Sequence, residues 1–134
     1  MKPTLSFVAP IRVQGYQRSD GNGRRRFTPK PTRDCMHAVK ALAMASVVRK
    51  IPKTHYARVE IDFRYSGFVR PDSDNAVKTV LDSLTGIAYD DDKQVAGRDC
   101  LVISLFECSG DSLTVSVYEN GERPMKKRKR GLIG

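Results

Sequence analysis

The feature that most constrains the fold is a strict alternation of apolar and charged side chains over residues 57–65. The apolar members are Ala57, Val59, Ile61, Phe63 and Tyr65, and the charged members between them are Arg58, Glu60, Asp62 and Arg64. A period of two residues is typical of a β-strand with one buried face. Because a lone strand is not stable in water, the chain must form a sheet whose apolar face is covered.

Three other segments predict strands. Leu5, Phe7, Ala9, Ile11 and Val13 alternate with more polar neighbours near the start of the chain. A third strand is expected within residues 95–106, and Leu113, Val115 and Val117 alternate as a fourth. Ser109-Gly110-Asp111 lies between these last two segments and predicts a hairpin turn.

Two segments between the strands have helical spacing. Thr32 can cap a first helix whose apolar face holds Val39, Leu42, Ala43, Val47 and Ile51, and Pro52 would stop it. A second helix is expected to start within residues 72–75, to bury Val77, Val80, Leu81 and Leu84, and to stop at Gly86. The order β-α-β-α-β-β predicts an α/β or α+β fold, in which helices pack on a small mixed sheet.

Composition sets the class of protein. The chain has 134 residues, 24 Lys+Arg against 15 Asp+Glu, and a net charge of +9, so a nucleic-acid partner is expected. We expect one domain over residues 1–122 and a disordered basic tail over residues 123–134. No apolar run is long enough to span a membrane. The three cysteines lack C-x-x-C spacing, which favours a reducing cytoplasm and predicts neither a disulfide framework nor a zinc site.

Charge is distributed unevenly along the chain. Residues 12–33 carry seven basic side chains and one acid, in a segment whose long loop (residues 15–30) exceeds the usual connection length. The tail carries six basic side chains and no acid. Between them stands an acidic island with a single lysine, Lys78; its six aspartates are Asp72, Asp74, Asp82, Asp90, Asp91 and Asp92.

The acidic island has a chemical and a structural interpretation. Two carboxylates about 5 Å apart repel by about 3 kcal/mol at an effective dielectric of about 20, and a hard divalent cation removes that cost. Such ions support phosphodiester hydrolysis, and a nearby lysine can stabilise the developing charge. Alternatively, Asp74 is a helix N-cap, residues 90–92 are a solvated loop, and Lys78 is a surface lysine paired along the helix. The residues alone leave both interpretations open.

The spacing within the island matches a known family. The matching residues are Arg70-Pro71-Asp72-Ser73-Asp74-Asn75, Lys78, Asp82, Leu84, Gly86 and Tyr89-Asp90-Asp91-Asp92-Lys93-Gln94-Val95. This set closely resembles the pattern of RusA-type Holliday junction resolvases: Asp-x-Asp-Asn, a lysine four residues on, Asp-x-Leu and Gly, then Asp-Asp-x-Gln. A second, shorter match is Phe27-Thr28-Pro29-Lys30-Pro31-Thr32, which is similar to the segment leading into the first helix of many members.

The resemblance implies a homodimeric, Mg²⁺-dependent endonuclease of bacteria or their phages that cuts four-way DNA junctions in recombination and repair; Mn²⁺ is a possible substitute ion. Asp72, Asp74 and Asp92 would then bind the metal, and Lys78 would be the catalytic lysine. Asp91 aligns with the family's preceding aspartate and would have a supporting role, whereas Asp90 is an extra residue.

Basic side chains are expected to contact the DNA backbone, because a junction is recognised by shape and charge. These are Arg24, Arg25, Arg26, Lys30, Arg33 and Arg70. Two alternatives remain at this stage. One is a metal-independent DNA-binding accessory protein, in which the aspartates serve only as caps and loop residues. The other is a less specific branched-DNA or flap nuclease.

Overall fold

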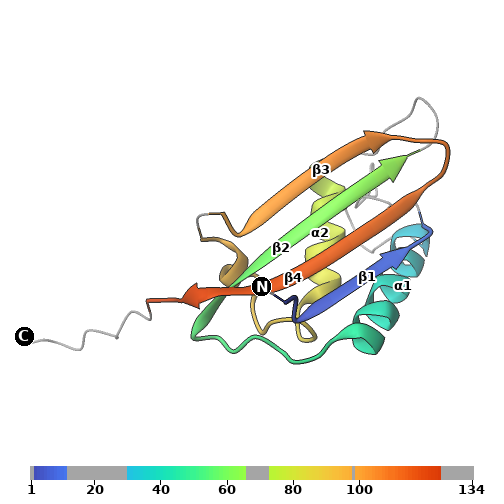
Figure 1. Ribbon diagram of the computed structural model, residues 1–134. Coiled ribbons are helices and arrows are strands. Elements are labelled where there is room, and N and C mark those ends of the chain that lie inside the picture. Colours follow the sequence, from blue (N-terminus) through green and yellow to red (C-terminus); the bar gives the residue numbers. More distant parts are fainter. Residues whose placement is uncertain (1, 12–29, 66–72, 98, 125–134) are drawn as a thin grey trace, which may run out of the picture.

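The computed structural model describes residues 2–11, 30–65, 73–97 and 99–124. Its elements are strand β1 (Leu5–Ala9), helix α1 (Lys30–Ser46), strand β2 (His55–Tyr65), helix α2 (Ser73–Leu84), the 3-10 helix η1 (Asp92–Val95), strand β3 (Leu101–Glu107) and strand β4 (Ser112–Glu122). The strands form one mixed sheet in the order β1-β4-β2-β3, and α1 and α2 cover one face of it (Figure 1). This confirms the predicted α+β class. No described helix is both long and apolar enough to cross a bilayer.

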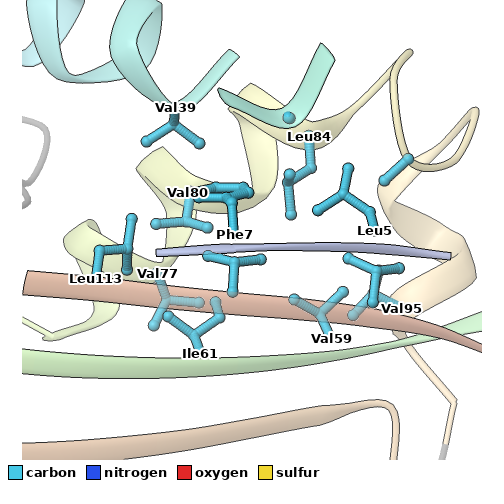
Figure 2. Close-up of a cluster of buried hydrophobic side chains, with 14 of the residues drawn as sticks. Leu5, Phe7, Val39, Val59, Ile61, Val77, Val80, Leu84, Val95 and Leu113 are labelled. Carbon is cyan, nitrogen blue, oxygen red and sulfur yellow. The ribbon is translucent and has the colours of Figure 1, made fainter. Parts of the chain in front are cut away.

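The core is built from apolar rows that run across the sheet. The middle row joins Phe7 of β1, Val115 of β4, Ile61 of β2 and Ile103 of β3, which are partners in register. The rows on either side are Leu5-Val117-Val59-Leu101 and Ala9-Leu113-Phe63-Leu105. Figure 2 shows Val39 of α1 and Val77, Val80 and Leu84 of α2 packed over these rows. Because paired residues point to the same side of a sheet, all members of a row face the side of the sheet on which the helices pack.

The connection between β3 and β4 differs from the predicted hairpin. Both strands pair with β2, β3 in parallel and β4 in antiparallel orientation, so β2 lies between them. Residues 108–111 therefore pass over the end of β2, and the Cys108 N–H donates to the Tyr65 carbonyl at 2.7 Å. The local turn residues indicate a reversal of direction, but they cannot show that another strand occupies the space between.

Helix α1 ends earlier in the sequence than predicted. It begins two residues before Thr32, which is therefore no N-cap, and it stops at Ser46 rather than at Pro52. After Ser46 the backbone forms hydrogen bonds with other segments: the Val48 N–H donates to the Thr4 carbonyl, and the Ile51 N–H donates to the Ala88 carbonyl. Ile51 is buried as predicted, but from an isolated bridge with Tyr89. These tertiary hydrogen bonds replace helical ones at β-branched residues with weak helix propensity.

Helix α2 agrees with the sequence prediction. It starts within residues 72–75, buries Val77, Val80 and Leu84, and is followed by Gly86 at φ 90°, a left-handed conformation that ends helices. The chain then returns through residues 85–91 and η1 to β3, which completes a β-α-β unit with β2. The expected third strand is thus divided, because residues 92–95 are helical and pairing begins at Leu101.

The expected basic regions are described only in part. Residues 12–29, which hold most of the basic loop, and residues 125–134 of the tail lie outside the described residues, as does Val13 of the first predicted strand. Arg123, at the start of the predicted tail, donates its backbone N–H to the Thr54 carbonyl at 2.7 Å. Its guanidinium group donates to the Lys53 carbonyl at 3.2 Å.

Candidate functional site

Helix α2 carries the first part of the acidic island on its outer side. Asp74 lies in the first turn, Lys78 is exposed one turn later, and Asp82 is half-buried one turn after that. Spacing by four residues places these positions on one face, opposite the face that packs on the sheet. Asp72 and the side chain of Asp74 lie outside the described residues. The predicted lysine is therefore on the same helix face as the second predicted metal ligand.

The second part of the acidic island is the aspartate triplet, Asp90, Asp91 and Asp92, which follows α2. The three carboxylates have different surroundings. Asp90 forms an ion pair with Lys50, with 2.7 Å between Oδ1 and Nζ. Asp91 Oδ1 accepts the backbone N–H of Lys93 at 3.0 Å and caps η1. Asp92 is exposed at the start of η1.

Asp91 and Asp92 interact with each other. The Lys93 N–H holds the pKa of Asp91 below its ordinary value, and a hydrogen bond with the Asp92 carboxyl adds to this effect. Asp91 is therefore ionised at neutral pH and bonded to its own helix. Asp92 is the member of the triplet that is both exposed and free of a basic partner among the described ion pairs.

Gln94 anchors the triplet to the rest of the molecule. Its side chain is fully buried, and Oε1 accepts the backbone N–H groups of Asp90 and Asp91 at 2.8 and 3.0 Å. Nε2 faces the carbonyl oxygens of Ile51, Pro52 and His55 at 3.3, 2.8 and 3.0 Å. One amide thus joins the aspartate loop to the segment that leads into β2. Sequence reasoning noted Gln94 only within the family pattern and missed Lys50.

Tyr89 joins the same loop to α2. Its ring is fully buried, and its hydroxyl donates to the Leu81 carbonyl at 2.9 Å. Burial raises the pKa of Tyr89 above its ordinary value, and the negative charges of Asp92 and Asp82 raise it further. The phenol is therefore neutral at every physiological pH and acts as a structural hydrogen-bond donor. Its sequence neighbours, Ala88 and Asp90, gave no signal for this role.

Asp74 and the aspartate triplet lie at opposite ends of α2. The helix rises by about 1.5 Å per residue, so Asp74 and Leu84 are about 15 Å apart along its axis. The triplet is bonded near the far end, through Tyr89 to Leu81 and through Gln94 to the entry of β2. Within the described side chains, no three His, Cys, Asp or Glu residues are grouped closely enough to hold a metal ion. One copy of the chain does not bring the Asp74 backbone and the triplet together.

Of the predicted DNA contacts, two positions fall in described elements. Lys30 begins α1, although its side chain is not described, and Arg33 is exposed in the first turn of that helix. Arg24, Arg25, Arg26 and Arg70 lie outside the described residues. Arg49 and Arg58 are engaged in ion pairs, with Glu119 at 2.7 Å and with Glu60 at 3.0 Å.

This basic chain carries carboxylates on the β-α-β unit of a small mixed sheet. A nuclease that cleaves phosphodiester bonds can use such groups. Comparison with protein families gives the same class, an endodeoxyribonuclease. The matching family is described as Endodeoxyribonuclease RusA, and the match covers residues 10–106, which is most of the chain. The protein therefore belongs to the RusA family of Holliday junction resolving endonucleases. No curated protein matches the chain significantly.

Proposed function

We propose that this protein cuts four-way DNA junctions by Mg²⁺-dependent hydrolysis, with Asp72, Asp74 and Asp92 as metal ligands and Lys78 as the catalytic lysine. The observation that most supports this assignment is the arrangement of the aspartate triplet. Asp90 is paired with Lys50 and Asp91 caps η1, whereas Asp92 is exposed on a loop that Gln94 holds in place. A loop that only needed to be soluble would not require a buried amide anchor.

The donor set fits a hard divalent cation. All three proposed ligands are carboxylates, and oxygen ligands with water are the preferred shell of Mg²⁺ or Mn²⁺. No histidine or cysteine belongs to the set, which disfavours zinc. When bound, such an ion supplies positive charge to the scissile phosphate and promotes formation of hydroxide.

The residues of the chain have separate tasks in this scheme. The carboxylates of Asp72, Asp74 and Asp92 would hold the ion, while Lys78, one turn beyond Asp74, would place its ammonium group near the phosphate. A fixed cation at that position stabilises the charge that builds on the phosphate oxygens during hydrolysis. Asp91 would support the site indirectly by keeping η1, and hence Asp92, in a fixed conformation.

The distance along α2 bears on how this site would be completed. Because Asp74 and the triplet lie at opposite ends of that helix, we propose that Asp92 of one copy joins Asp72 and Asp74 of another in a homodimer. A two-fold dimer would then contain two equivalent sites. Two such sites suit a four-way junction, in which two opposing strands must be cut.

The basic side chains would provide affinity rather than chemistry. Arg33 is exposed at the start of α1, and Arg24, Arg25, Arg26, Lys30 and Arg70 are its proposed partners in contacting phosphates. The tail adds further positive charge of unassigned role. Contacts of this kind are not specific for bases, so selectivity would come from the branched shape of the substrate.

A panel of labelled DNA substrates tests the proposed function. A four-way junction, a flap and a linear duplex of the same sequence are incubated with the protein, with Mg²⁺ or with EDTA. We expect paired, symmetric cuts in the junction only when Mg²⁺ is present. Binding without cleavage would select the accessory-protein alternative, and equal cutting of flap and junction would select the less specific nuclease. Either outcome would overturn the proposal.

A further inference from the structure

The apolar rows of the sheet extend beyond the helices that cover them. In every row the members on β1, β4 and β2 are at most 7% exposed. The fourth members, on β3, are Leu101, Ile103 and Leu105, and they are 38, 40 and 39% exposed. They point to the same side as their buried partners, because they are in register with Val59, Ile61 and Phe63. We call these three side chains the apolar β3 strip.

Strand β3 is also an open edge of the sheet. Among the described strands it pairs only with β2, so its other side presents backbone N–H and C=O groups. Figure 1 shows β3 along one border of the sheet, on the side opposite β1. Edge strands of soluble proteins are usually short, charged or interrupted by proline, because an unprotected edge recruits other strands.

The two edges of this sheet differ in that respect. Strand β1 has five residues and is bracketed by Pro3 and Pro10. Strand β3 has seven residues, LVISLFE, with no proline and no charge before Glu107. The chain thus protects one edge and leaves the other able to pair.

We infer that the apolar β3 strip and the adjoining β3 edge are the surface on which a second copy of this chain docks. The inference rests on the proposed function, which requires a second copy to complete the acidic site. A two-fold contact places the same patch of both copies together, so each β3 would meet its partner's β3 in antiparallel orientation. The strip is uncharged, and self-contact therefore brings no like charges together.

The chemistry of the strip favours a second copy over DNA. A polyanion is bound through basic side chains, and Leu101, Ile103 and Leu105 offer none. Strand addition at an open edge, in contrast, gains main-chain hydrogen bonds and buries alternate side chains. Both are available here, since every second residue of β3 is an exposed aliphatic side chain on the helix-covered side.

The mass of the protein in solution tests this assignment. The variants are Ile103→Glu on the strip and Val8→Glu on β1, where Val8 is an exposed apolar side chain on the other edge strand, 65% exposed. Light scattering of the wild type is expected to give twice the protomer mass of 15.0 kDa. Ile103→Glu should raise the dimer dissociation constant by at least about tenfold, and Val8→Glu should leave it unchanged.

A milder variant distinguishes loss of the dimer from loss of the fold. Ile103→Thr combined with Leu105→Thr removes apolar surface but keeps good strand propensity, and circular dichroism of each variant checks its folding. Dimers that persist in folded strip variants, a dimer broken by Val8→Glu alone, or a monomeric wild type would each overturn the inference. The mass of the protein in solution is measured without DNA, so this test does not depend on junction cleavage. A dimer that forms through β3 but cuts no junction would therefore refute the proposed function and keep the interface.

Discussion

The three consecutive aspartates of the triplet have the same side chain but different surroundings, and this gives them different roles. Asp90 is neutralised by Lys50, Asp91 is hydrogen-bonded to its own helix, and Asp92 is exposed. A metal ligand must be accessible, and it must not be held by another cation. Asp92 meets these conditions best, in agreement with its position in the family pattern.

This assignment predicts opposite results for two substitutions of the same kind. Asp92→Asn should lower junction cleavage by at least about a hundredfold, or ~2.7 kcal/mol of barrier, because a ligand to the ion is lost. Asp90→Asn should stay close to wild type, since an exposed ion pair contributes at most about 1 kcal/mol to stability. Single-turnover cleavage of the labelled junction measures both. A defect in Asp90→Asn as large as in Asp92→Asn would contradict the assignment.

Individual roles could be predicted from the sequence only where a pattern extends over several residues. The spacing of Asp74, Lys78 and Asp82 predicts one helix face, and α2 confirms it. The ion pair of Lys50 with Asp90 joins residues forty positions apart, and no local pattern contains it. Tyr89 next to the triplet looks like any aromatic residue, and only its buried hydrogen bond to Leu81 reveals its role.

At the element scale, the loop between α2 and β3 depends on Gln94. Replacing this side chain with leucine would leave the N–H groups of Asp90 and Asp91 without their acceptor. Each buried polar group left without a partner costs about 1–3 kcal/mol, so Gln94→Leu should lower the free energy of unfolding by about 3 kcal/mol. Lys93→Leu, at the exposed neighbouring position, should change it by less than about 0.5 kcal/mol.

Chemical denaturation of the two leucine variants measures this difference. Hydrogen exchange at the amides of Asp90 and Asp91 gives a local readout, because both amides should exchange faster in Gln94→Leu than in Lys93→Leu. Equal stability and equal exchange in the two variants would show that the amide does not anchor the loop.

Most elements follow from the sequence, and two of the errors have the same physical origin. The period of two predicts β2 and β4, and helical spacing with Gly86 predicts α2 and its end. The end of α1 and the supposed hairpin were wrong because distant partners decide them. Thr4 and Ala88 accept the hydrogen bonds that would have extended α1, and β2 lies between β3 and β4.

In the whole molecule, Asp74 and the aspartate triplet are separated by the length of α2, although only a short stretch of sequence lies between them. The described backbone places them at opposite ends of the helix, because α2 is rigid and its far end is fixed by Tyr89 and Gln94. We therefore propose that two copies of the chain share each cleavage site.

Mixing two inactive variants tests whether each site is shared between two copies. Asp74→Asn and Asp92→Asn are refolded together in equal amounts and assayed on the labelled junction with Mg²⁺, beside each variant alone. In a shared arrangement, half of the dimers are mixed and each has one intact site, so about a quarter of all sites should be active. Each variant alone should be inactive, and the mixture should recover strand nicking. A mixture as inactive as its components, although mixed dimers form, would contradict the shared arrangement.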